Sequence, residues 1–346
     1  MKKSIFAVCD LEASYSCRLM EYIHEKQGKI FEVQAFTSVK NLCEFAKEQE
    51  IELLLISTQA MCDEIRKLPI GKIMILSEGE QLEELSNYPC IYKYQASDHL
   101  LAEVMSCYAD QKPLNPLPLL KKGVRIVGIY SPVKRVLKTS FALTLGQILA
   151  KDRAVLYLNL ESYSGFPHLL RKEFKADISD LMYFVRRGSD SLIFKLGSMV
   201  QSLNNLDYLP PAVSAADIRS VSGEEWSALL DTVKMYSAYD TIILDLDEIL
   251  DGLPGLLRQC DVIYMPVRED GISIAKIRQY EKMLELQEYE DVLKKTKKLK
   301  LPFHSSFGSK EHYLEELIWS ELGDFVRTLI REGEMDERYV RTDSGI

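Results

Sequence analysis

Short apolar segments alternate with segments of helical periodicity along most of the chain, and this alternation limits the folds that the chain can adopt. Near the start, the apolar runs IFAVCD, FEVQAFT and IELLLIS are separated by stretches whose apolar residues recur at helical spacing. Strands that alternate with helices form βαβ units, in which neighbouring strands run parallel. The sequence therefore predicts an α/β protein built from doubly wound parallel sheets.

The length and the proline content predict two domains joined by a linker. A chain of 346 residues is long enough for about two domains, each with its own core. Five strand-like runs in residues 1–110 match the flavodoxin-like, doubly wound order. Residues 111–122 are rich in proline, which fixes φ and disfavours helix, so we expect a semi-rigid linker there. Residues 123–346 then form the second domain.

Composition narrows the function classes. The chain has no run of about 18 apolar residues, and its first residues lack the pattern of a leader peptide, so we expect a cytoplasmic protein. Its seven cysteines are scattered without metal-ligand spacing, and we interpret them as reduced thiols. A net charge of −9 argues against broad nucleic-acid affinity of the whole molecule.

The first domain resembles the receiver domains of response regulators. Its first strand ends at Asp10, Glu12 follows two residues later, and the fifth strand carries Lys93. Receivers end the third strand with the aspartate that is phosphorylated, but Ser57 stands at that position. A serine hydroxyl is a poor nucleophile and a poor Mg²⁺ ligand at neutral pH. We therefore expect a degenerate receiver that binds proteins or dimerises, and not a phosphorelay domain.

The segment RIVGIYSPVKRVLKTSFALTLGQILA, residues 125–150, has the layout of a phosphate-binding strand, loop and helix. In such loops a lysine reaches the β- and γ-phosphates and a neighbouring hydroxyl binds Mg²⁺, which are the roles that Lys138 and Thr139 fit. The two glycine positions of the motif carry Pro132 and Leu137, so the pattern itself fails. The alternative is an ordinary strand–loop–helix connection, although the helix N-terminus would still attract an anion.

Polar residues follow three other strands of the second domain. Glu161 ends the run AVLYLNLE, Asp245 ends the run TIILD, and residues 266–270 follow the run VIYM. Ligands of open α/β sheets bind outside the carboxyl ends of the strands. Because Lys138 is expected at the same edge, these features together predict a pocket for an anion or a nucleotide.

The second domain resembles the MinD/ParA superfamily of deviant Walker-A ATPases, and the whole chain resembles its TadZ/CpaE branch. The resemblance lies in SPVKRVLKTSFALTLG, VLYLNLESYSGF, DIRSVSGEEW and CDVIYMPVRED, behind a receiver-like domain. It implies ATP or ADP as ligand, Mg²⁺ held by Thr139 and Asp245, and a catalytic role for Glu161 beside the hydrolytic water. It places the nucleotide contacts at Ser131, Pro132, Val133, Lys134, Arg135, Val136, Leu137, Lys138, Thr139, Ser140, Pro266, Val267, Arg268 and Asp270.

The sequence departs from that family at the loop. The position of the signature lysine is occupied by Val133, with Lys134 one residue out of register, and glycines are replaced by Pro132, Arg135 and Leu137. These changes should strain or re-route the backbone, while the added cations could replace lost N–H contacts. Hydrolysis needs groups held to fractions of an ångström, so we expect ATP binding with weak or absent hydrolysis.

The resemblance implies a localisation or assembly factor for Tad pilus or secretion machinery. Such a protein would form a homodimer, bind pilus or secretion assembly proteins, and act in the cytoplasm at a cell pole, with indirect membrane contact and no specific nucleic acid. One alternative is a nucleotide-free pseudo-ATPase scaffold. Another is a ParA-like partition ATPase that binds DNA non-specifically through the lysine run at 294–300, which could also touch lipid or simply protect an edge strand.

Periodicity also predicts the helices of the second domain. We expect helical structure over 191–203, a helix from Ser222 with a capping box to Glu225, one long helix over 272–295 and a closing helix over 313–332.

Overall fold

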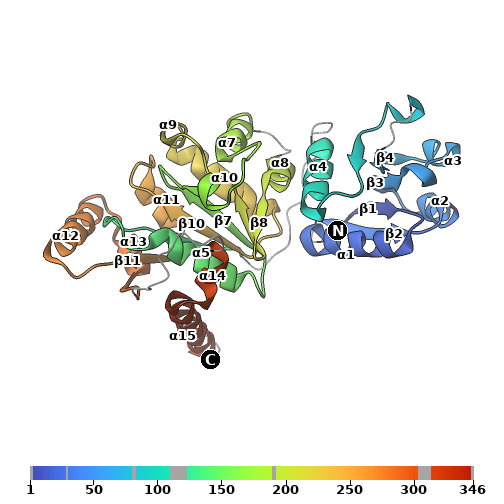
Figure 1. Cartoon of the computed structure of the whole chain (residues 1–346). Helices are drawn as coiled ribbons and strands as arrows, with labels where there is room; N and C mark the ends of the chain where they lie inside the picture. The colour runs from blue at the N-terminus through green and yellow to red at the C-terminus, as the bar shows by residue number, and fades with distance from the viewer. Residues whose placement is uncertain are drawn as a thin grey trace. The chain divides into compact units, whose positions relative to one another are not determined.

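The computed structural model describes residues 3–28, 30–79, 83–109, 123–188, 192–302 and 313–343. The chain divides into two compact units, which Figure 1 shows in colours that follow the sequence. The first unit comprises Met1–Leu120, Gly188–Met199 and Met235–Ala238, and the second comprises Lys121–Arg187, Val200–Lys234 and Tyr239–Ile346. The expected linker, with Pro113, Pro116 and Pro118, lies outside the described residues.

The first unit contains a parallel five-stranded sheet with the order β2-β1-β3-β4-β5. This is the flavodoxin-like order that the sequence predicts. Its strands are β1 (Ser4–Cys9), β2 (Phe31–Phe36), β3 (Ile51–Ser57), β4 (Ile70–Ser77) and β5 (Cys90–Tyr92). Its helices are α1 (Ala13–Gln27), α2 (Val39–Glu48), α3 (Asp63–Arg66), α4 (Ser97–Ala109) and α8 (Leu192–Met199), with 3₁₀ turns at Thr58–Ala60 and Glu83–Leu85.

The second unit contains a seven-stranded sheet with the order β12-β11-β6-β10-β7-β9-β8, in which only β8 runs antiparallel to its neighbour. The strands are β6 (Arg125–Ile129), β7 (Val155–Leu160), β8 (Gln201–Leu203), β9 (Leu206–Leu209), β10 (Thr241–Leu246), β11 (Val262–Pro266) and β12 (Thr296–Leu299). The α/β class with parallel strands, predicted from the alternating pattern, is confirmed.

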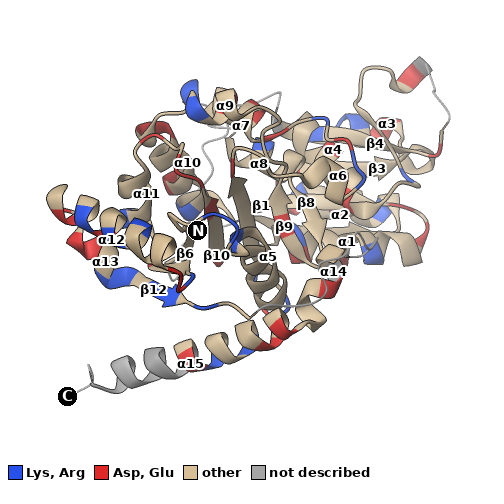
Figure 2. Cartoon of the chain, turned by 60° about the vertical axis from the view of Figure 1, so that its left-hand side comes forward, with Lys and Arg blue, Asp and Glu red and all other residues tan. Residues whose placement is uncertain are grey.

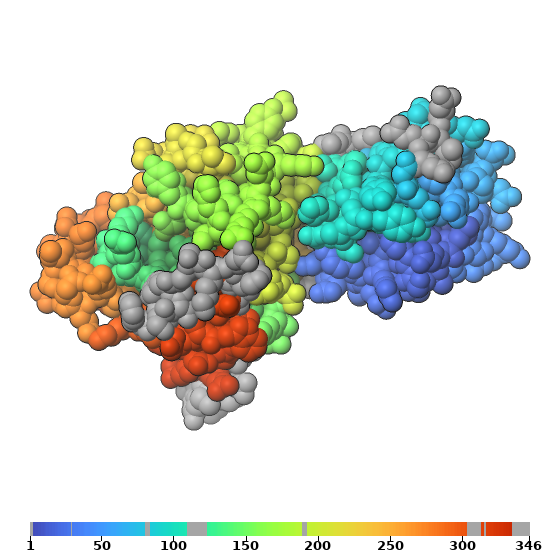
Figure 3. All heavy atoms as spheres, viewed as in Figure 1, coloured from blue at the N-terminus to red at the C-terminus, as the bar shows by residue number. Residues whose placement is uncertain are grey.

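Helices connect and cover these strands. They are α5 (Lys138–Leu149), α6 (Phe166–Leu169), α7 (Ile178–Arg186), α9 (Ala215–Arg219), α10 (Gly223–Tyr236), α11 (Leu253–Gln259), α12 (Gly271–Leu286), α13 (Glu290–Lys295), α14 (Tyr313–Glu316) and α15 (Glu321–Asp343), with a 3₁₀ turn at Leu317–Trp319. The core packs α5 between the sheet and α15, where Phe141, Leu322 and Val326 are buried together. In Figure 3 the orange-red atoms of α14 and α15 gather in one patch on the surface of this unit. No described helix has the length and apolar character needed to cross a membrane.

Three of the helix expectations need correction. Residues 191–203 are not one helical segment, because α8 ends at Met199 and β8 follows. β8 turns back into β9 through Asn204 and Asn205, at φ 47° and 66°, and asparagine tolerates the positive φ of such a two-residue hairpin.

The capping box at Ser222 is confirmed. The Ser222 hydroxyl accepts from the Glu225 N–H at 3.2 Å, and the Glu225 carboxylate accepts from the Ser222 N–H at 2.9 Å.

The long helix expected over 272–295 is broken into α12 and α13 at Glu288, which has φ 60°. Arg258 of α11 donates to the Glu288 carbonyl at 2.6 Å and to Asp291 at 2.7 Å. The closing helix over 313–332 is also broken, at Ser320, whose hydroxyl accepts from the Gly323 N–H at 3.4 Å. In both places side-chain hydrogen bonds replace the helical pattern.

Candidate functional site

The loop between β6 and α5 keeps a left-handed backbone at two residues that are not glycine. Arg135 has φ 59°, and Leu137, the N-cap of α5, has φ 61°. For a residue other than glycine, this conformation is less stable by about 1–2 kcal/mol, because Cβ comes too close to the following carbonyl oxygen. The expectation that the missing glycines strain the loop is therefore met at these two positions, and α5 begins at Lys138 as the sequence suggested.

A cavity of about 860 Å³ opens at this loop. Its volume lies in the usual range for pockets that hold small molecules and cofactors. It is lined by Val133, Lys134, Arg135, Val136, Leu137, Lys138, Thr139, Ser140, Glu161, Val267, Arg268 and Leu301. The structure thus brings together most of the predicted nucleotide contacts, from the loop, from the end of β7 and from the segment after β11. Leu301 is an addition, and its place just beyond β12, at the same sheet edge, is the signal that could have found it.

Several residues that the resemblance placed at the nucleotide support the cavity and do not line it. The buried Ser131 hydroxyl donates to the Pro266 carbonyl at 2.7 Å and accepts from the Val133 N–H at 3.1 Å. Asp270 is the N-cap of α12 and accepts from the Ser273 N–H at 3.0 Å. Ser131, Pro266 and Asp270 thus support the wall through these hydrogen bonds. Pro132 is not among the lining residues, and Asp245 lies fully buried beneath Lys138.

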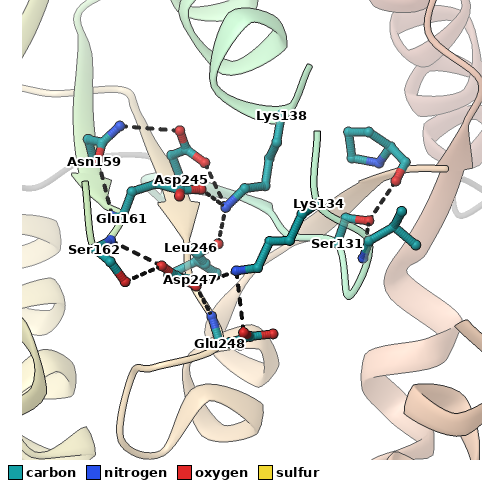
Figure 4. Close-up of polar contacts among 12 residues, drawn as sticks. Ser131, Lys134, Lys138, Asn159, Glu161, Ser162, Asp245, Leu246, Asp247 and Glu248 are labelled. Carbon is teal, nitrogen blue, oxygen red and sulfur yellow. Dashed lines mark hydrogen bonds and ion pairs between the residues drawn. The ribbon is translucent and has the colours of Figure 1, made fainter. Parts of the chain in front are cut away.

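Lys138 is held by acceptors from two strands, as Figure 4 shows. Its ammonium group pairs with Glu161 after β7 and lies 3.2 Å from Asp245 Oδ1 on β10, and it donates to the Leu246 carbonyl. Burial alone would lower the pKa of Lys138, but the Asp245 and Glu161 carboxylates outweigh it and raise that pKa. Burial raises the pKa of Glu161 against the opposing effect of Lys138. Lys138, the lysine predicted to contact phosphate, is therefore charged and already paired.

A hydrogen-bonded network fixes the Asp245 carboxylate. Its Oδ2 atom accepts from the Tyr157 hydroxyl at 3.0 Å and from the Asn159 amide at 3.3 Å. Asn159 also accepts from the Glu161 N–H at 3.1 Å, which ties the end of β7 to β10. Tyr157 was missed at the sequence level, although it stands two residues before Asn159 and therefore on the same face of the strand.

A second cluster surrounds Asp247, which follows β10. The sequence places Asp247 with Asp245 at the carboxyl end of this strand but gives it no role of its own. Its carboxylate accepts from Lys134 Nζ at 2.9 Å, from the Ser162 hydroxyl at 2.6 Å and from the Ser162 N–H at 3.0 Å. It also accepts from the Glu248 N–H at 2.6 Å. Burial opposes ionisation, but the Ser162 and Lys134 donors outweigh it and hold the pKa of Asp247 well below its usual range.

The substitution Asp247→Asn is expected to make the free energy of unfolding depend less on pH in acid. Because the folded-state pKa of Asp247 is lowered, its carboxylate stabilises the fold above the unfolded pKa of about 4 and loses that effect as pH falls through the folded value. Urea unfolding between roughly pH 5 and pH 2 should therefore cost the unsubstituted protein more stability than Asp247→Asn. Parallel curves for the two proteins would show that Asp247 is not so coupled.

Of the two residues predicted to hold Mg²⁺, Thr139 lines the cavity, whereas Asp245 is buried and its carboxylate is engaged by Lys138, Tyr157 and Asn159. Both side chains carry hard oxygen atoms, which Mg²⁺ prefers, and Mg²⁺ is commonly held by one or two protein groups together with phosphate oxygens and water. Among the described residues, no cluster of three or more His, Cys, Asp or Glu side chains could hold a metal alone.

No protein-family model matches the chain, and no curated protein matches it. Among solved structures, a ParA family ATPase from Chlorobium tepidum TLS has a TM-score of 0.43 at 21% identity, over 57% of this chain and 80% of that one. A putative plasmid partition protein from Borrelia burgdorferi B31, bound to AMPPNP, has 0.40 at 14%, over 57% and 95%. The MinC:MinD cell division complex of Aquifex aeolicus has 0.40 at 19%, over 52% and 69%.

Proposed function

We propose that this protein binds Mg·ATP, or ADP, in the cavity at the start of α5. One observation carries the proposal: Arg135 and Leu137 keep the left-handed backbone of a phosphate-binding loop around a nucleotide-sized cavity, without glycine. Strained backbone of this kind persists only where the surrounding structure imposes it, and it is concentrated at functional sites. An ordinary connection between β6 and α5 would have no need of it.

The lining residues suggest a division of roles. Lys138 and the N-terminus of α5 would face the phosphates, with Arg135 and Lys134 supplying further positive charge at the loop. Thr139 and Asp245 would hold Mg²⁺, which lends its charge to the phosphate oxygens when it is bound. The wall formed by Val267, Arg268 and Leu301 is left for the base and sugar.

Weak or absent hydrolysis belongs to the same proposal. The carboxylate expected beside the attacking water is Glu161, which pairs with Lys138 in the ligand-free protein. Hydrolysis needs groups held to fractions of an ångström, whereas the loop around the phosphates has strained backbone at Arg135 and Leu137 in place of glycine. We therefore expect slow turnover, if any.

On the sequence resemblance, we extend the proposal to a TadZ/CpaE-like localisation or assembly factor that acts as a homodimer with pilus or secretion proteins. The protein-binding role of the receiver-like part rests on the resemblance, and the first unit bears on the alternative of phosphoryl transfer. Lys93 lies 2.9 Å from Asp10, 3.5 Å from Glu12 and 3.2 Å from Glu78, and Ser57 is buried at the end of β3. With its lysine paired in this way and no acceptor aspartate at Ser57, this cluster is poorly suited to phosphoryl transfer.

The pairing of Lys138 also supports a second candidate, a scaffold that holds no nucleotide, since internal carboxylates already neutralise the lysine. For the partition-type alternative, the lysine run 294–300 is the relevant surface. Figure 2 shows red residues beside blue ones on α12 and α13, whereas β12 carries blue residues without red ones. Lys298 pairs with Glu281 at 2.6 Å and Lys300 pairs with Glu269, which lowers the charge available to DNA phosphates.

Mg·ATP is expected to stabilise the protein against heat. At a ligand concentration about 100-fold above Kd, binding to the folded state alone adds about 2.7 kcal/mol to the free energy of unfolding. The gain should require Mg²⁺, because oxygen atoms from both protein and ligand must hold the cation. Thermal unfolding with ATP, with Mg·ATP, and with Mg·ATP plus chelator measures it. No shift at millimolar Mg·ATP supports the scaffold, and salt-sensitive retention of duplex DNA supports the partition alternative.

A further inference from the structure

The phosphate-binding loop needs an external support, because its own residues do not favour its conformation. Glycine accepts positive φ without steric cost, but Arg135 and Leu137 do not. Such residues return to ordinary backbone angles unless neighbouring contacts over-determine them. The contacts that hold this stretch should therefore be identifiable in the structure.

The start of the loop is fixed by Ser131, whose hydroxyl joins the Pro266 carbonyl to the Val133 N–H. Between that anchor and the left-handed pair stands Lys134, and its ammonium group lies 2.9 Å from Asp247 Oδ1. The Lys134 side chain is 53% exposed, whereas that of Asp247 is only 4% exposed. The fixed member of the pair is thus the carboxylate.

Asp247 is held in place from several directions. Its Oδ2 atom accepts both donors of Ser162, and its Oδ1 atom accepts the Glu248 N–H as well as Lys134. Charge-assisted hydrogen bonds of this kind are shorter and stronger than those between neutral groups. One buried carboxylate therefore joins the loop before α5, the segment after β7 and the segment after β10, and Figure 4 shows the three segments meeting there.

We infer that Asp247 is the positioning residue of the phosphate-binding loop. Its pair with Lys134 stabilises the left-handed backbone that glycines would adopt without strain. The inference deepens the proposed function and rests on it for the identity of the ligand. The same carboxylate also accepts both donors of Ser162, the residue that follows Glu161. Asp247 therefore anchors both the loop and the segment that carries Glu161, the partner of Lys138.

Glu248 provides a matched control. It also approaches Lys134, at 3.5 Å, but its side chain is 57% exposed. An exposed pair of this kind contributes little to stability. If the effect of Asp247 were only that of a nearby negative charge, then Glu248→Gln should resemble Asp247→Asn.

The first test needs no nucleotide. Hydrogen–deuterium exchange of the peptide that covers residues 131–140 should be about fivefold faster in Asp247→Asn and in the milder Lys134→Met than in the unsubstituted chain, because local opening governs exchange. Glu248→Gln should leave the rate unchanged. Equal rates in all four proteins would overturn the inference, whether or not the protein binds ATP. If the exchange rates differ as expected but the unsubstituted chain does not bind Mg·ATP, the proposed function is overturned and the inference is not.

The second test separates positioning from a general structural effect. Asp247→Asn should weaken Mg·ATP binding about fivefold in isothermal titration, but less than twofold when Arg135→Gly and Leu137→Gly are also present, because glycine adopts positive φ freely. A merely structural Asp247 would cause the same loss in both backgrounds. That result would overturn the inference.

Discussion

Replacement of Lys138 by methionine is expected to lower the free energy of unfolding by about 3–5 kcal/mol even without nucleotide. The reason is the Asp245 carboxylate, which is 0% exposed and has its cation partner 3.2 Å away on Lys138. Removing one member of a buried pair leaves an uncompensated charge, which costs far more than the intact pair contributes. Equilibrium unfolding in urea measures the change.

The control for this prediction is the double variant Lys138→Met with Asp245→Asn. An asparagine oxygen can still accept from the Tyr157 hydroxyl, which lies 3.0 Å from Asp245, without a buried charge. We therefore expect the double variant to recover much of the lost stability while Mg·ATP binding stays absent in both. A loss below about 1 kcal/mol in the single variant, the size of an exposed pair, would contradict the description of the site.

Substitution of Glu161 by glutamine is expected to strengthen Mg·ATP binding about tenfold, which corresponds to about 1.4 kcal/mol. Glu161 pairs with the ammonium group of Lys138 in the ligand-free protein, so phosphate must displace it. A neutral amide competes less well than a carboxylate, because it lacks the negative charge that attracts the Lys138 ammonium group at short range. Isothermal titration with Mg·ATP gives the affinity directly.

Glu285→Gln on the exposed surface of α12 is the matched control, since it removes the same charge away from the cavity. Its affinity should equal that of the unsubstituted protein within about twofold, because exposed charges are screened by salt. If Glu161→Gln weakens binding instead, then Glu161 contacts the ligand or its metal and does not compete with it. That result would leave the proposal of nucleotide binding intact, but it would contradict the idea that Glu161 competes with phosphate for Lys138.

The sequence was sufficient to bring Lys138, Glu161 and Asp245 to one edge of the sheet, because the geometry of parallel sheets is general. Lys138 follows β6, Glu161 follows β7 and Asp245 lies near the end of β10, and the carboxyl ends of these parallel strands lie at one edge. Their pairing could not be predicted. It depends on the register that sets Asn159 beside Asp245 and on the depth at which Lys138 is buried.

The errors have equally specific causes. The hairpin at Asn204 and Asn205 carried a readable turn signal, which the apolar run before it obscured. The break at Glu288 is different, because Arg258 of α11 imposes it from a distant part of the sequence. No local pattern in the 272–295 segment reports such a contact, so helix propensity alone predicts continuity there.

Lys134 and Asp247 have to be interpreted together, because they form one ion pair. Read along the sequence, Lys134 is a lysine one residue away from its expected position. In the folded chain it meets a buried carboxylate at 2.9 Å. Residues that contact each other in one network change each other's effects, so neither could have been interpreted alone.

The pairing of both loop lysines with internal carboxylates has a consequence for how a ligand enters. Lys138 and Lys134 already have partners in Glu161 and Asp247, so uptake of a polyphosphate is an ion exchange and not the filling of a vacant positive site. Its free energy is the difference between two sets of ion pairs, both of which dissolved salt weakens. The affinity of this site should therefore vary little with ionic strength. At a site whose lysines have no carboxylate partners, the affinity would fall as the salt concentration rises.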